Sequence, residues 1–186
     1  MRYFIKNMVC NRCIMVVQHV FESLGHSPEH ISLGEVETTA AMSEDEVGKL
    51  RKALEGFGFE LIEDTRSRII EKIKTSIVES IHQNHDDLKI NYSEYIESQL
   101  NRDYAYLSSL FSESEGITIA QYIIHQKIER VKELLVYDEL TLSEIADLMG
   151  YSNVAYLSNQ FKKVTGVTPS QFKLEKVNKR IPLDEV

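Results

Sequence analysis

The stretch 140–173 constrains the fold most strongly, because it predicts two short helices joined by a tight turn. The first helix has one apolar face, formed by Leu142, Ile145, Ala146 and Met149. Gly150 follows at a position where a left-handed residue ends a helix. Ser152 or Asn153 is placed to cap the second helix. That helix carries a predicted apolar stripe of Val154, Leu157, Phe161 and Val164. Two helices with a turn of about three to four residues are typical of a helix-turn-helix motif.

The chain contains this pattern twice. Residues 90–122 align without gaps on residues 140–172, at an offset of 50. The tetrapeptide Ala-Tyr-Leu-Ser occurs at 105–108 and again at 155–158. Further equivalent pairs are Phe111 and Phe161, Gly116 and Gly166, Thr118 and Thr168, and Gln121 and Gln171. The sequence therefore predicts two helix-turn-helix motifs, joined by a helix at 119–136.

The second copy resembles the second helix-turn-helix of AraC/XylS-type transcription regulators. The resemblance is carried by the segments SEIADLMGYSN, AYLSNQFKK and TGVTPSQF. With the repeat included, it covers about residues 67–175. It implies an all-α domain that binds double-stranded DNA, with the recognition helix 153–165 in the major groove. The alternative from the residues alone is a helical hairpin that binds nothing.

The resemblance also implies which side chains meet DNA. Base edges face Val154, Ala155, Ser158 and Asn159 in the second copy, and Ala105, Ser108 and Ser109 in the first. Asn159 is the strongest candidate, because a side-chain amide pairs with adenine in bidentate fashion. Contacts to phosphate, which position the protein without specifying sequence, are assigned to Arg102, Lys162, Lys163, Thr168 and Lys173.

Charge is distributed unevenly along the chain. The net charge of −8 argues against general nucleic-acid binding. The segment 152–181 nevertheless has one acidic residue, Glu175, and six basic residues: Lys162, Lys163, Lys173, Lys176, Lys179 and Arg180. This is the footprint expected of an element that contacts phosphates. The first copy instead has Glu113 and Glu115 where the family has cations. We therefore expect the first recognition helix to face DNA only weakly, or to bind a protein partner.

The first 64 residues predict a separate small domain. Strands are predicted at 3–9, 31–39 and 57–62, and helices at 14–24 and 43–55, with Gly34 as a bulge or tight bend. Ser43 and Glu46 form a capping-box pair. This β-α-β-(β)-α-β order suggests a ferredoxin-like α+β sheet with two helices on one face. A helix at 66–85 follows, so we divide the chain into domains 1–64 and 65–177 and a tail 178–186.

Two cysteines lie at the first strand–helix junction, in Met8-Val9-Cys10-Asn11-Arg12-Cys13. Two thiolates three positions apart can converge on a soft ion, and we expect the helix amino-terminus to lower the pKa of the thiols. Cysteine ligands suit Cu(I) or Zn(II). With Gly58-Phe59 before the last strand, the segment resembles heavy-metal-associated, copper-chaperone-like domains. This implies Cys10 and Cys13 as metal ligands, and Met8 packed beneath the loop.

Three functions follow from these motifs. The first is a sequence-specific transcription regulator that responds to a soft metal ion or to thiol state. The second is a metal-handling or protein-interaction protein whose helical half no longer reads DNA. The third is an oxidoreductase that uses Cys10 and Cys13, and a structural relic without metal is a further possibility for the thiol pair.

Other features of the sequence limit the cellular location and the class of protein. No apolar run has the length of a membrane span, and the amino-terminus lacks the features of a secretory signal. We therefore expect a cytoplasmic protein with no membrane partner. We expect no enzyme, because the six histidines are scattered and neither a Gly-x-Ser-x-Gly motif nor a phosphate loop is present. Pairing through the non-DNA domain is frequent in the resembled family, which implies a homodimer.

Overall fold

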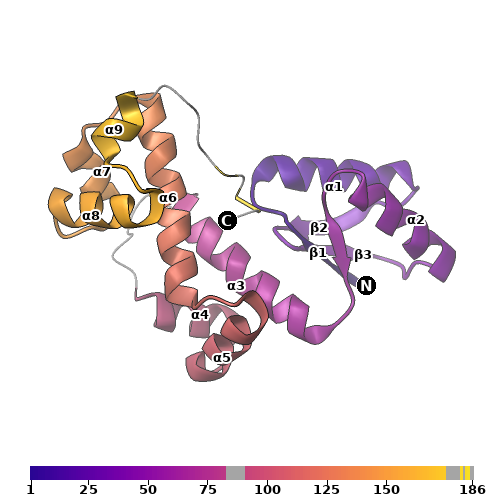
Figure 1. Cartoon of the computed structure of the whole chain (residues 1–186). Coiled ribbons are helices and arrows are strands. Elements are labelled where there is room, and N and C mark those ends of the chain that lie inside the picture. The colour runs from indigo at the N-terminus through magenta and orange to yellow at the C-terminus, as the bar shows by residue number, and fades with distance from the viewer. Residues whose placement is uncertain (83–90, 175–180, 182, 185–186) are drawn as a thin grey trace. The chain divides into compact units, whose positions relative to one another are not determined.

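The computed structural model describes residues 1–82, 91–174, 181 and 183–184 of the 186-residue chain (Figure 1). The chain divides into two compact units, Met1–Ser76 and Ile77–Val186. The division falls inside one helix, α3 (Thr65–His82). The helix predicted at 66–85 is present, and its last three positions lie outside the described residues. No helix in the described parts of the chain has the length and apolar character needed to cross a bilayer.

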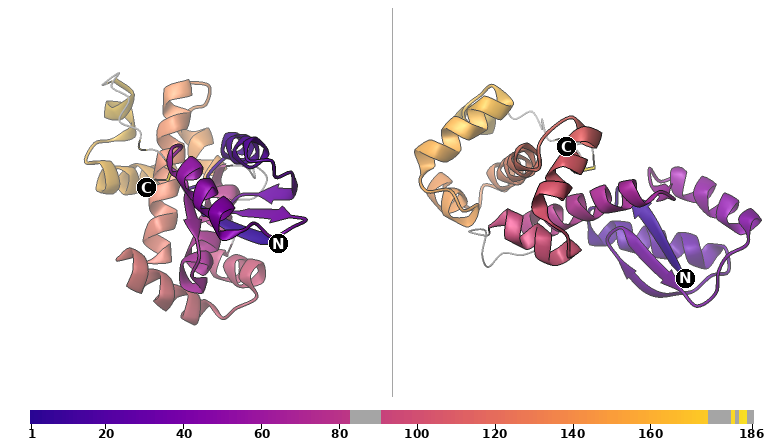
Figure 2. Two further views of the ribbon diagram at one scale, coloured as in Figure 1. Left: turned by 90° about the vertical axis from the view of Figure 1, so that its right-hand side faces the viewer. Right: turned by 90° about the horizontal axis from the view of Figure 1, so that it is seen from below.

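The first unit is built on a four-stranded antiparallel sheet. The strands are β1 (Arg2–Lys6), β2 (Pro28–Ser32), β3 (Glu35–Thr38) and β4 (Glu60–Ile62), in the spatial order β2-β3-β1-β4. All neighbouring strands are antiparallel. The unit also contains two helices, α1 (Asn11–Ser23) and α2 (Glu44–Glu55). The prediction of a small sheet with two helices is confirmed, and Figure 2 shows the strands and helices from two further sides.

Helices cover both faces of this sheet. Successive side chains of a strand point to opposite faces, so neighbouring residues of β1 show what lies on each. Tyr3 and Ile5 of β1 are buried in a core with residues of α1 and α2. Phe4, between them, lies under Arg68 and Lys72 of α3, at 4.6 and 5.3 Å from its ring centre. Within this unit, residues 65–76 of α3 therefore cover the face of the sheet opposite α1 and α2.

Left-handed residues make the strands shorter than predicted. The first strand ends at Lys6 because Asn7 has φ +73°, and the last begins at Glu60, after Gly58 at φ +82°. The strand-like segment predicted at 31–39 is divided at Gly34, the position predicted as a bulge or tight bend. It is a hairpin, since Gly34 at φ +79° forms a two-residue turn with Leu33, and Ser32 pairs with Glu35. A side chain at this φ is strained, so glycine suits the turn.

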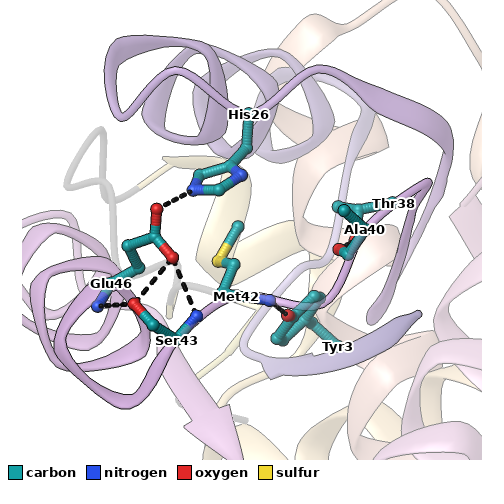
Figure 3. A network of polar contacts seen from close by, with 7 residues as sticks. All are labelled: Tyr3, His26, Thr38, Ala40, Met42, Ser43 and Glu46. Carbon is teal, nitrogen blue, oxygen red and sulfur yellow. Dashed lines mark hydrogen bonds and ion pairs between the residues drawn. The ribbon is translucent and has the colours of Figure 1, made fainter.

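Polar contacts fix the approach to α2 (Figure 3). Ser43 caps the helix, with Ser43 N donating to Glu46 Oε2 at 2.8 Å and Glu46 N donating to Ser43 Oγ at 3.4 Å. This is the predicted capping box. Glu46 Oε1 also lies 3.3 Å from His26 Nε2. The Tyr3 hydroxyl accepts a 2.8 Å hydrogen bond from Met42 N, which holds the segment before α2 against β1.

The second unit repeats one arrangement of helices. The first helix-turn-helix consists of α4 (Tyr92–Leu100) and α5 (Tyr104–Glu115), and the second of α7 (Leu142–Leu148) and α8 (Val154–Thr165). Each is followed by a further helix, α6 (Ile119–Tyr137) or α9 (Pro169–Leu174). Figure 1 shows α4 and α5 at one end of α6, with α7, α8 and α9 at the other. The predicted repeat and linking helix are confirmed.

The helix caps of the two copies also correspond. The side chains of Asp103 and Asn153 accept hydrogen bonds from the backbone N–H of Tyr106 and Tyr156, at 3.0 and 2.8 Å. Thr118 and Thr168 form equivalent capping boxes, each with the glutamine three residues later. The helices α5 and α8 both end at a left-handed glycine, Gly116 or Gly166. Each copy therefore carries its own start and stop signals.

Candidate nucleic-acid interface

The second recognition helix, α8, is held by its buried side. Leu157 and Phe161 are fully buried, and the Phe161 ring meets the edge of Phe172 with centroids 5.6 Å apart. Asn153 caps the helix, as predicted. Val164, expected in the apolar stripe, is instead 38% exposed, so the stripe ends before the last turn.

The base-reading candidates of α8 share one outward side. Ala155 and Asn159 are exposed, whereas Val154 and Ser158 are half-buried. Ala155 and Asn159 are four residues apart and therefore lie one above the other on the helix surface. A small apolar side chain next to a carboxamide can meet a thymine methyl and an adenine edge, respectively.

The first recognition helix, α5, presents the same shape with different chemistry. Leu107 and Phe111 are buried, Ala105 and Ser109 are exposed, and Ser108 is half-buried, as at the equivalent positions of α8. The Ser109 hydroxyl donates to Glu113 Oε1 at 3.1 Å. A carboxylate thus adjoins the central reading position, where phosphates would be repelled.

The phosphate candidates fall into two groups. Arg102, Lys162 and Lys163 are exposed, the two lysines in the last turn of α8. Lys173 is exposed but ion-paired with Asp138, and the Thr168 hydroxyl accepts from Gln171 N at 3.2 Å as the cap of α9. Three members of the predicted basic cluster lie outside the described residues: Lys176, Lys179 and Arg180.

The cysteines form a second candidate site. Cys10 is the N-cap of α1 and Cys13 lies in its first turn, with the two Sγ atoms 3.5 Å apart. Both are half-buried, and Met8 is fully buried in the core of the first unit. Burial raises the pKa of the Cys13 thiol, which corrects the expectation of a lowered pKa. Among the described residues, no cluster of three or more histidine, cysteine or acidic side chains is arranged to hold a metal ion.

Two hydrogen bonds from Asn7 hold the loop that precedes the cysteines. The backbone N–H of Asn7 donates to Glu71 Oε1 of α3 at 2.9 Å. Its side-chain amide donates to the carbonyl oxygen of Gly58, also at 2.9 Å. The thiol loop therefore has a direct hydrogen bond to α3 within the first unit.

Comparison with known proteins identifies the helical part. Residues 97–175 match a family model described as a helix-turn-helix domain. The fold also matches the C-terminal domain of AraT, a response regulator from Geobacillus stearothermophilus, at 26% identity and a TM-score of 0.51. That match covers 63% of this chain and 94% of the other. Residues 97–175 form a helix-turn-helix domain.

Similarity to curated transcription regulators extends beyond this helix-turn-helix domain. The Msm operon regulatory protein of Streptococcus mutans is 30% identical over 137 residues, which cover 69% of this chain and 47% of that protein. The uncharacterized transcriptional regulatory protein YesN of Bacillus subtilis is 37% identical over 70 residues, 37% of this chain and 19% of that protein. This chain thus spans less than half the length of these relatives.

Two tyrosines in the helix-turn-helix domain were not singled out from sequence. Tyr106 and Tyr156 are 49% and 55% exposed, at equivalent positions beside the reading candidates. The Tyr156 ring lies 5.9 Å from that of Tyr151, whose hydroxyl donates to Gln160 Oε1 at 2.6 Å. The signal was present in the repeated Ala-Tyr-Leu-Ser tetrapeptide, because an aromatic residue kept outside the apolar stripe in both copies indicates a surface position.

Proposed function

We propose that this chain is a sequence-specific, DNA-binding transcription regulator whose principal reader is α8. The observation that carries the proposal is the outward side of that helix. It combines exposed Asn159, which can read adenine, with exposed Lys162 and Lys163 one turn further on. The match to a helix-turn-helix family model and the transcription regulators among the relatives support the same assignment.

The dimensions of the domain suit a duplex. At about 1.5 Å per residue, the 19 residues of α6 span about 28 Å. Successive major grooves on one side of B-DNA are about 34 Å apart. Two motifs carried at the ends of such a helix can therefore address neighbouring grooves.

The two motifs contribute unequally in this proposal. The last turn of α8 carries two lysines, whereas α5 carries Glu113 and Glu115 and no basic residue. We infer that α8 supplies most of the affinity and that α5 adds shape and limited contact. Because α5 contributes little, pairing of two chains would supply a second copy of α8. This supports the expectation of a homodimer.

The test is DNA binding by the full chain, measured by fluorescence anisotropy on duplexes from its own upstream region. Asn159→Ala should weaken the specific duplex by about 1–3 kcal/mol and leave random duplex unchanged. Lys163→Ala should weaken both and reduce the salt slope by about one. Ser109→Ala, at the equivalent position of α5, is the matched control and should have a smaller effect. A wild-type chain that binds all duplexes equally would remove the regulator assignment.

We further propose that the first unit is a ferredoxin-like, heavy-metal-associated domain whose Cys10 and Cys13 respond to a soft metal ion or to thiol state. Its strand order and alternating helices support the fold. The residues present fit Cu(I) better than Zn(II). Both donors are thiols, whereas structural zinc takes four ligands and the described residues bring together two. When bound, such an ion would hold both sulfur atoms as thiolates.

A route for the response lies within the first unit. A change at Cys10 acts on the loop that contains Asn7, and Asn7 is hydrogen-bonded to Glu71 of α3. Buried Met8 limits how the loop can move, so displacement is directed toward this hydrogen bond. The position of α3 against the sheet would then depend on the state of the thiols.

Titration of the full chain with Cu(I), and separately with Zn(II), tests this second proposal. The number of thiols that react with an alkylating reagent should fall from two to none at one equivalent of the bound ion. Cys10→Ser/Cys13→Ser should abolish the protection. DNA affinity measured at each ratio shows whether the ion regulates binding. Protection of the thiols in a chain that binds no specific DNA would favour the alternative, a metal-handling protein whose helical half serves another partner.

A further inference from the structure

A cavity separates the two helix-turn-helix motifs. Its volume is about 620 Å³, and it is lined by residues of both copies. Tyr92 and Tyr104 come from the first motif, and Tyr151 and Tyr156 from the second, while α6 contributes Ile123 and Lys127. Among the described residues, the lining contains no aspartate or glutamate. The two motifs therefore face each other across a gap, and Lys127 is a cationic side chain in its wall.

Lys127 connects the two sides of this gap. Its Nζ atom donates to the carbonyl oxygen of Met149, at the end of α7, over 2.9 Å. The same atom lies 5.5 Å from the ring centre of Tyr92 in α4 and 5.6 Å from that of Tyr151. Both distances are within the range of cation–π attraction. One side chain on the linking helix thus contacts both motifs.

A lysine is a costly choice for this position. Burial disfavours the ammonium and lowers the pKa of Lys127. An apolar side chain would fill the space without that cost. It would provide neither the directed hydrogen bond to Met149 nor the attraction to two aromatic rings. These contacts depend on angle and distance, so they constrain how the motifs are placed on α6.

We propose that Lys127 determines the spacing between the two DNA half-sites that the motifs read. It sets the rotation and separation of α5 and α8, and hence the number of base pairs between the half-sites. This role rests on the proposed DNA-binding function. It assigns Lys127 to selection of the site's geometry, without contact to a base.

The spacing test uses the duplex protected by the full chain, with one or two base pairs inserted or removed between the half-sites. Two base pairs change the separation by about 7 Å and the rotation by about 70°. Wild type should lose affinity about tenfold on this change, as expected when contacts to one half-site are lost. The affinity of Lys127→Met should vary less than about threefold across the duplexes with altered spacing. This variant should bind an isolated α8 half-site as tightly as wild type does. Lys49→Met, an exposed lysine of the first unit, is the charge-matched control.

Two results of this test would overturn the proposal. One is an unchanged spacing profile for Lys127→Met. The other is an equal loss on every duplex, isolated half-site included, which indicates a purely structural role. Tyr92→Leu should relax the spacing in the same direction, because it removes one ring and leaves the hydrogen bond.

A measurement without DNA separates this inference from the proposed function. Spin labels at Glu113→Cys and Lys163→Cys, in a Cys10→Ser/Cys13→Ser background, report the distance between α5 and α8. The distribution should be narrow with Lys127 and clearly broader with Lys127→Met. A distribution that stays narrow removes Lys127 from this role. DNA binding is judged on the unlabelled wild type, because Lys163 is itself a phosphate candidate. A broadened distribution, combined with a wild type that binds no specific DNA, supports the positioning role and rejects the regulator proposal.

Discussion

Ser109 donates its hydroxyl to Glu113 Oε1 at 3.1 Å, and the residues fifty positions later are Asn159 and Lys163. The two helices thus have the same buried side and opposite charge at one exposed position. In α5 the Glu113 carboxylate accepts a hydrogen bond from the hydroxyl of Ser109, which is the base-reading candidate. In α8 the equivalent position carries a cation that suits phosphate.

Converting α5 toward α8 should strengthen DNA binding. Ser112→Lys/Glu113→Lys introduces the two lysines of α8 at their equivalent positions. We expect higher affinity for all duplexes and a salt slope steeper by about two, because each new phosphate contact adds nearly one. Anisotropy titrations between about 50 and 200 mM salt measure both the affinity and the salt slope. Ala41→Lys/Glu55→Lys, at two exposed positions of the first unit, changes the net charge by the same amount and is the control. An equal gain there would show that α5 does not approach DNA.

Asp138 should restrain Lys173. The two side chains form an exposed ion pair, and Asp138 has a left-handed backbone at φ +57°, which asparagine also tolerates. Asp138→Asn should therefore release Lys173 for phosphate and change stability by less than about 1 kcal/mol. DNA affinity should rise about twofold to threefold, in keeping with one additional ionic contact. The gain should vanish in Asp138→Asn/Lys173→Met, and persistence there would assign it to repulsion by Asp138 itself.

Cys13 should react slowly at neutral pH. Burial raises the pKa of its thiol, so less of the reactive thiolate is present at neutral pH than in a free cysteine. Alkylation of Cys13, followed by peptide mass spectrometry, should show a rate midpoint above that of free cysteine. Metal binding displaces the thiol proton, so affinity for a soft ion should increase with pH. A midpoint at or below that of free cysteine would contradict the burial argument.

Glu46 should make the first unit sensitive to acid. The hydrogen bond from Ser43 N, followed by that from the Ser43 side chain, lowers the pKa of the Glu46 carboxyl. Its folded pKa is below the unfolded value of about 4.3, so the stabilisation is present above that value and is lost as pH falls through the folded pKa. Glu46→Gln keeps an acceptor for the capping box and removes this titration. Thermal unfolding from neutral pH to about pH 3 should show a weaker acid dependence in the variant, and identical curves would exclude Glu46 as a source.

The helical unit was predictable because its signals are local and occur twice. Helical spacing located Leu157 and Phe161, and the gapless repeat identified α4 and α5 even though α5 lacks basic residues. Val164 was misplaced because its spacing fits the stripe, whereas the last turn of α8 extends beyond the core. Spacing describes a helix face and contains no information on where the partner surface ends.

The strands were harder to predict, because one residue in a left-handed conformation changes them. Gly34 fits a bulge or a turn equally well from sequence, and the pairing of Ser32 with Glu35 decides between the two. Asn7 gave no signal that it would end β1. Lys127 was also missed, since its role depends on Tyr92 and Tyr151, which are distant in sequence and meet only in the folded domain.

The matched caps of the two motifs have an evolutionary consequence. Asp103 and Gly116 delimit α5 as Asn153 and Gly166 delimit α8, so neither helix relies on its solvent-facing side chains to form. After duplication, one copy can exchange lysines for glutamates without losing its shape. Natural selection is then free to retain that copy as a scaffold while the other specialises in recognition.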